Sequence, residues 1–109
     1  MSFLPRRSPL CAAVVGALLS VGLASPAAAA THVVVIDQMK YAPVPPLKVG
    51  DVVTFVNKDM FRHTVTASNN SFNLDLMPGA SGSLHINSAG HAVFYCKYHP
   101  GMRGTMDAK

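Results

Sequence analysis

The chain has 109 residues, with nine Lys or Arg against five Asp or Glu and a formal net charge of +4 at pH 7. Two of the nine cations lie in the N-terminal segment, so residues 31–109 keep seven cations and five Asp, a net charge of +2. This weak charge removes the main support for nucleic-acid binding. A length of this order predicts one small domain, which hydrophobic burial alone stabilises only marginally.

The N-terminal segment has the pattern of a secretory signal peptide. Arg6 and Arg7 precede a nearly unbroken apolar run, Leu10–Ala24, and small residues follow at 27–30, just before Thr31. We therefore expect residues 1–30 to be a cleaved signal peptide and residues 31–109 to be the exported, periplasmic domain. An uncleaved N-terminal anchor is the alternative. After cleavage we expect no stable membrane insertion.

Residues 31–109 contain short β-rich runs separated by turn residues and no convincing helical period. Prolines make the stretch Met39–Pro46 irregular, and Gly50-Asp51 is expected to form a turn before the second long run. The expected strands are His32–Asp37, Val52–Asn57, His63–Ala67, Ser81–Asn87, His91–Cys96 and Arg103–Ala108, with Leu47–Val49 leading into the second. About seven short strands in so short a chain predict an all-β sandwich or barrel.

A short motif near the C-terminus, Cys96-x2-His99-x2-Met102, places a thiol, an imidazole and a thioether close together. A thiolate, two imidazoles and a weak axial thioether form the ligand set of an electron-transfer copper site. Cys11 leaves with the signal peptide, so Cys96 is the only thiol of the exported domain and cannot form an internal disulfide. An unpaired cysteine in an exported protein needs a reason, and metal binding supplies one.

The second imidazole must come from elsewhere in the chain, and strand alternation selects it. His63 shares a strand face with Val65 and is expected to point inward, whereas His85 is expected to point outward. His91 also takes the outward face of its strand, opposite Cys96, and His32 is expected to be frayed. A single buried cysteine, histidine or methionine is more often an ordinary core residue than a metal ligand. Their joint occurrence favours a metal site.

With these motifs the sequence resembles the blue copper proteins, or cupredoxins, most closely the amicyanin- and plastocyanin-like members. The landmarks are Lys48–Asp51, Phe55–Asn57, His63–Val65, Met77–Gly79 and the motif Cys96-x2-His99-Pro100-x-Met102-x-Gly104. The resemblance implies a two-sheet Greek-key β-sandwich of about seven strands. It also implies one copper ion, Cu(I) or Cu(II), at one end of the sandwich, bound by His63, Cys96 and His99 with Met102 as axial ligand.

One departure from the family pattern concerns the residue after the first histidine. Many members have Asn there, and this chain has Thr64. The backbone N–H at this position can still reach the sulfur of Cys96, but a side-chain tether between the ligand segments could differ. Asn57 could tie down the segment that carries His63, although an ordinary asparagine at a strand end is an equal alternative.

The expected function is one-electron transfer by a small monomeric carrier, and an enzyme is not expected because four ligands leave no open metal position. The alternative is a periplasmic protein for copper resistance or delivery. Scattered methionines and the absence of a His-rich tract favour the carrier. The expected partners are redox proteins, a cytochrome or a periplasmic oxidoreductase, with acidic docking surfaces. They would meet an apolar patch with a basic rim, comprising Phe61, Met77-Pro78, Pro100 and Gly101 with Arg62, Lys97 and Arg103.

Overall fold

The computed structural model describes residues 28–109. All but the last three residues of the predicted signal peptide lie outside this range, so that assignment stays a prediction. Within residues 28–109, no helix is long and apolar enough to cross a membrane.

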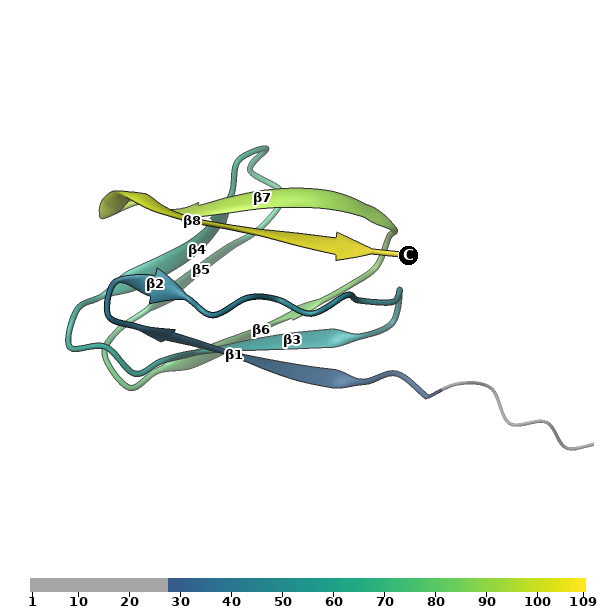
Figure 1. Cartoon of the computed structure of the whole chain (residues 1–109), viewed down its shortest axis with the longest axis horizontal. Helices are drawn as coiled ribbons and strands as arrows, with labels where there is room; N and C mark the ends of the chain where they lie inside the picture. The colour runs from purple at the N-terminus through teal and green to yellow at the C-terminus, as the bar shows by residue number, and fades with distance from the viewer. Residues whose placement is uncertain (1–27) are drawn as a thin grey trace, which may run out of the picture.

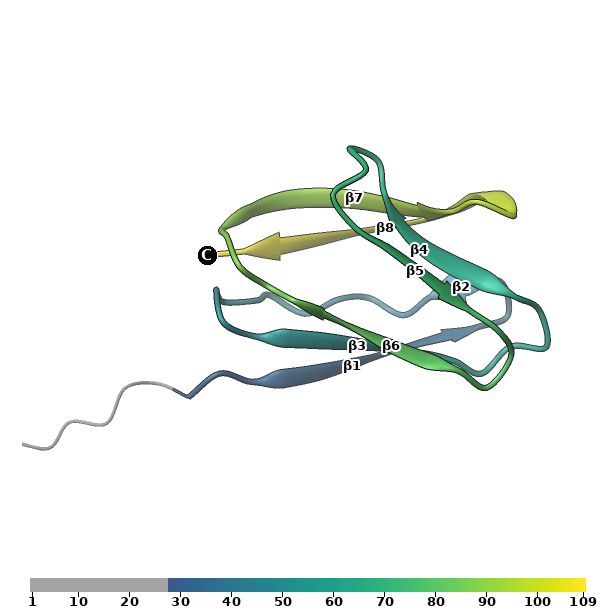
Figure 2. The same ribbon diagram turned by 180° about the vertical axis from the view of Figure 1, so that it is seen from behind.

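Two four-stranded sheets pack face to face, and Figures 1 and 2 show the two layers from opposite sides. The first sheet has the order β2-β1-β3-β6, with bounds Lys40–Tyr41, Thr31–Asp37, Val52–Asn57 and Ser81–His85. The second has the order β5-β4-β7-β8, with bounds Asn73–Leu76, His63–Ala67, Gly90–Cys96 and His99–Ala108. Strands β1 and β3 pair in parallel, and the other neighbours are antiparallel. The predicted all-β sandwich is confirmed, and residues 28–109 form eight strands in place of about seven.

The strands differ from those expected mainly at β2, β5 and β8, and β6 ends at His85, two residues before the expected end. The short strands β2 and β5 were not predicted, because two to four residues carry too little pattern and their pairing partners are distant in sequence. Strand β8 begins at His99, four residues before the predicted start, although it contains Pro100 and Gly101. It lies at the edge of its sheet, where a proline without an N–H group is tolerated.

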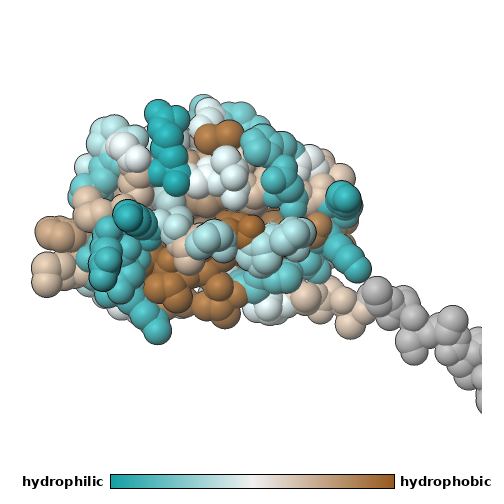
Figure 3. Space-filling view, viewed as in Figure 1, coloured by the Kyte–Doolittle hydropathy of each residue, from teal (hydrophilic) through white to brown (hydrophobic). Residues whose placement is uncertain are grey.

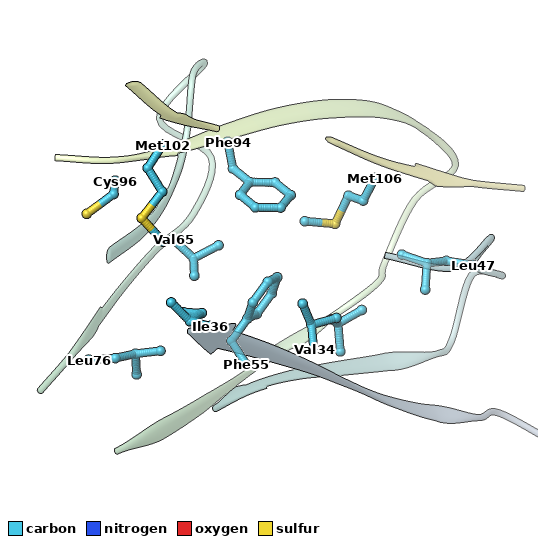
Figure 4. Packing of buried hydrophobic residues seen from close by; sticks show 11 residues of the cluster. Val34, Ile36, Leu47, Phe55, Val65, Leu76, Phe94, Cys96, Met102 and Met106 are labelled. Atoms are coloured by element: carbon cyan, nitrogen blue, oxygen red, sulfur yellow. The ribbon is translucent and has the colours of Figure 1, made fainter. Parts of the chain in front are cut away.

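The core lies between the sheets and centres on aromatic side chains. Phe55 and Phe94 face one another from opposite sheets, with ring centroids 5.6 Å apart and an edge-to-face angle of 76°. Tyr41 packs edge-on against Phe94 at 4.8 Å. Figure 4 shows Cys96 and Met102 at one end of this cluster and Leu47 at the other. The predicted metal ligands thus close one end of the core.

The start of β1 is held in place, which corrects the expectation that His32 is frayed. Its ring nitrogen Nε2 lies 2.9 Å from Oδ2 of Asp51, a buried carboxylate on the turn before β3. Backbone N–H groups of Ala30 and Lys48 also donate to this carboxylate. These bonds, with that from His32, lower the pKa of Asp51 to about 2. A parallel neighbour and a buried acceptor together fix a strand that the sequence alone leaves free.

Candidate metal centre

Three of the four predicted ligands meet around one buried sulfur atom. His63 opens β4, Cys96 ends β7 and His99 opens β8, so the end of one sheet supplies all three. Nδ1 of His63 lies 3.7 Å from Sγ of Cys96, and Nδ1 of His99 lies 3.5 Å from it. The three ligand atoms lie within 4.8 Å of one another.

These distances fit a metal ion between the three side chains. In a trigonal site, bonds of about 2.0 Å to nitrogen and about 2.3 Å to sulfur, separated by about 120°, place the two ligand atoms about 3.7 Å apart. The observed sulfur–nitrogen separations match this value without movement of the side chains. His63 and Cys96 are fully buried and His99 is half-buried, so His99 is the most exposed of the three ligands.

The fourth predicted ligand, Met102, is buried on β8 and belongs to the same apolar cluster as Cys96. In Figure 4 the sulfur atoms of both residues lie at the same end of the core. A methionine beside a two-histidine, one-cysteine set corresponds to the weak axial ligand of electron-transfer copper sites. The donor set therefore fits copper better than zinc, for which methionine is a poor ligand.

Asp59 orients the ring of His63 and was not anticipated from the sequence. Its Oδ2 lies 2.8 Å from Nε2 of His63, which leaves Nδ1 free to face the sulfur. The hydrogen bond with His63, followed by one from the N–H of Met39, lowers the pKa of Asp59. A carboxylate on the second ring nitrogen fixes the tautomer and direction of a metal-binding histidine. The sequence signal was an aspartate four residues before a candidate ligand.

Thr64 joins the two ligand segments. Its N–H donates to Sγ of Cys96 at 3.3 Å, and its Oγ1 accepts a hydrogen bond from the N–H of Lys97 at 2.9 Å. The backbone contact expected from the family pattern is therefore present. The side-chain tether is present too, because the threonine hydroxyl reaches the residue after Cys96. The difference between Thr and Asn at this position leaves the connection in place.

Asn57 fixes the loop between β3 and β4. The side chain is fully buried, and its Nδ2 donates to the carbonyl oxygens of Phe61 and Leu76 at 2.8 and 3.0 Å. Its Oδ1 accepts from the N–H of Asp59 at 2.9 Å. The structure thus supports the interpretation that Asn57 ties down the His63 segment over that of an ordinary asparagine at a strand end.

The remaining histidines do not join the centre. His85 is exposed on β6, as strand alternation predicted, and His91 is exposed and pairs with Asp107 at 2.6 Å. His32 is engaged with Asp51. The two predicted histidine ligands, His63 and His99, are the ones that the fold brings to Cys96. His99 occupies the first position of β8, whereas the expected strands left it in the connection between Cys96 and Arg103.

No protein-family model matches the chain, and no curated protein matches it. Solved structures do match. A reduced amicyanin variant is 31% identical, with a TM-score of 0.63, and the match covers 72% of this chain and 82% of that one. An oxidised amicyanin variant is also 31% identical, with the same TM-score of 0.63 and coverage of 72% and 81%.

A purple cupredoxin from Nitrosopumilus maritimus has a TM-score of 0.65 at 22% identity, and the match covers 72% of this chain and 99% of that one. This likeness supports the fold alone. The amicyanin matches also support membership of the family, because they combine a shared fold with identity above 30% over most of the related chain. The chain belongs to the cupredoxin family of blue copper proteins and is similar to amicyanin.

Proposed function

We propose that this protein binds one copper ion through His63, Cys96, His99 and Met102 and carries single electrons between redox proteins. The observation that carries the proposal is the pair of imidazole Nδ1 atoms 3.5 and 3.7 Å from one buried sulfur. Copper bound there would supply the one-electron couple between Cu(I) and Cu(II).

The surrounding residues suit a carrier better than an enzyme. Asp59 hydrogen-bonds the ring nitrogen of His63 that faces away from the centre, and Thr64 hydrogen-bonds both Cys96 and the residue that follows it. Ligands held in this way change little between oxidation states, which keeps electron transfer fast. Four donors around one ion also leave no open position for a substrate.

Electrons would enter and leave at the exposed edge of His99. The ring of Phe61, whose exposed fraction is 49%, lies 6.1 Å from the ring of His99. Met77 is also exposed. A small apolar patch next to a redox centre suits the brief encounters of electron carriers. We propose that the protein works in the periplasm and meets partners with acidic docking surfaces there.

The basic rim of this patch is smaller than the sequence suggested. Arg62 forms a two-point ion pair with Asp75, at 2.8 and 2.6 Å, and stacks over the ring of Tyr98 at 4.9 Å. Its charge is therefore largely compensated. Lys97 and Arg103 are exposed and flank the ligand segment. These two cations are the ones that we expect to steer an acidic partner.

Copper binding is tested by Cys96→Ser. The intense absorption of a blue copper site requires a bond between Cu(II) and a thiolate, so the variant is expected to lose this absorption. Its far-ultraviolet circular dichroism in the metal-free state should stay that of the native fold. A strongly blue Cys96→Ser variant would contradict the assignment of Cys96.

Electron transfer is tested with Lys97→Glu against the matched control Lys48→Glu. Both lysines are exposed, and Lys48 follows Leu47 at the opposite end of the core. We expect Lys97→Glu to slow the bimolecular rate with an acidic partner at low salt, leaving the copper spectrum unchanged. Equal rates for the two variants would argue against this docking surface.

A further inference from the structure

Three methionines that are scattered in the sequence gather at the metal end of the molecule. Met60, Met77 and Met39 have exposed fractions of 77%, 56% and 37%, whereas Met102 and Met106 are buried. Met39 belongs to the turn between β1 and β2, Met60 to the loop between β3 and β4, and Met77 to the turn between β5 and β6. Figures 1 and 2 agree that these connections lie at the same end as the β7–β8 tip. Apolar side chains project from this end in Figure 3.

Hydrogen bonds tie these three segments to one another. The N–H of Met39 donates to Oδ2 of Asp59, the residue before Met60, at 2.9 Å. Nδ2 of Asn57 bonds the carbonyl oxygens of both Phe61 and Leu76, the residues that follow Met60 and precede Met77. The backbones that carry the three thioethers therefore converge on Asn57 and Asp59. Asp59 also holds His63, so this surface adjoins the inner metal centre.

Met39 lies in the two-residue turn of the β1–β2 hairpin, where the pairing of Asp37 with Lys40 requires positive φ values. Gln38 and Met39 have φ values of 52° and 61°, in the left-handed region that Gly and Asn normally occupy in such turns. A methionine there gains no backbone advantage, and its side chain is not buried in the core.

We propose that Met39, Met60 and Met77 together form a surface binding site for Cu(I). Thioethers are soft, uncharged donors that select Cu(I) over harder cations. Methionine side chains are long and flexible, so three that belong to hydrogen-bonded neighbouring segments are suited to adapt to one soft ion. The site adds copper acquisition to the proposed electron transfer, and it lies next to the loop that carries His63. Cu(I) held there needs no change of oxidation state to reach the inner centre.

The test uses the protein already loaded with one Cu(I), labelled with carbon-13 at the methionine methyl groups. A second equivalent of Cu(I) is added as its acetonitrile complex without oxygen. We expect the methyl signals of Met39, Met60 and Met77 to shift together and to saturate at one added equivalent. The signals of Met102 and Met106 should not move. Absent shifts, or three independent shifts without saturation at one equivalent, would overturn the proposal.

A triple variant, Met39→Leu with Met60→Leu and Met77→Leu, separates coordination from apolar docking. Leucine keeps the apolar surface but removes sulfur, so we expect the second equivalent of Cu(I) to be lost. The copper content and absorption of the inner site should stay native. The control is Val33→Leu with Val49→Leu, two exposed positions outside these three connections, which should retain the second equivalent.

The outcomes distinguish this site from the inner one. Uptake of the second equivalent by the triple leucine variant would refute the thioether site while leaving the inner centre untouched. An unmodified protein that shows no blue absorption after it is loaded with copper and oxidised would instead refute the proposed carrier. If the triple variant lost electron-transfer rate but not Cu(I) uptake, the methionines would serve as a docking patch and the inference would fall.

Discussion

Replacing Gly104 by alanine should disrupt the contact between β8 and the aromatic core. A Cβ atom at this position would overlap Cζ of Phe94 and lie 2.5 Å from Cε2 of the same ring, about 1 Å inside ordinary van der Waals contact. The ring of Phe94 cannot easily retreat, because Tyr41 and Phe55 pack against it at 4.8 and 5.6 Å. Gly104 has no positive φ, so the effect of the substitution is steric and not conformational.

The size of the effect follows from the cost of overpacking a filled core. Such insertions destabilise by about 1–3 kcal/mol. In a domain of this size 1 kcal/mol lowers the melting temperature by about 4–8 °C, so 2 kcal/mol corresponds to about 8–16 °C. Thermal unfolding of the metal-free protein, followed by circular dichroism, measures this directly. Because β8 also carries His99 and Met102, the copper spectrum should change as well.

Gly101→Ala is the matched control, since a Cβ there meets nothing within 4 Å. A metal-free Gly104→Ala protein that melts within about 2 °C of this control would refute the reasoning. A smaller ring supplies a second test. Phe94→Leu combined with Gly104→Ala should be less destabilised than the sum of the two single variants, because the second substitution removes the clash of the first.

Met102→Leu should keep the thiolate–copper absorption and raise the reduction potential, measured by voltammetry, because the loss of the fourth donor leaves three ligands, a number that Cu(I) tolerates better than Cu(II). Replacing His85 and His91 together by Gln should leave the copper spectrum unchanged, and a lost blue band would overturn the outward orientation of these side chains. Asp59→Ala should weaken copper affinity, measured by competition with a chelator, by about 10–100-fold because the ring of His63 loses its carboxylate partner. The pKa of Asp51 falls from 3.8 to about 2 on folding, so its stabilising contribution is complete above about pH 4 and is lost as the pH falls toward 2. Acid unfolding of Asp51→Asn should therefore depend less on pH in this range, and an unchanged acid transition would exclude the role of this carboxylate.

The ligands were predictable because their signal is local or periodic. Cys96, His99 and Met102 lie within seven residues, and strand alternation separates His63 from His85. The sandwich was predictable for the same reason, since several runs alternate or are β-branched. These patterns depend on neighbours in the chain and need no knowledge of the tertiary structure.

Asp59 and the methionine surface were not predictable, because their arrangement depends on pairings between distant segments. Asp59 was unremarkable in sequence until the fold placed His63 against it. The three exposed methionines lie up to 38 positions apart in sequence, and strand pairing together with the hydrogen bonds of Asn57 and Asp59 brings their segments together. Scattered methionines in a sequence are therefore weak evidence against a copper-handling surface.

The metal centre lies where regular strand pairing stops. The ladder between β4 and β7 runs from Ala67↔Phe94 to Thr66↔Tyr95 and then ends. The pairing of β7 with β8 shifts register between Tyr95 and Cys96. Continuing the first ladder would place Thr64 opposite Lys97, and there the Oγ1 of Thr64 accepts the N–H of Lys97 in place of a backbone carbonyl. The Thr64 side chain thus connects β4 and β7 beyond the last backbone pair of their ladder. The register shift between β7 and β8 redirects the side chains beside it. The thiol of Cys96 is left between two imidazoles, at a separation that one metal ion can bridge.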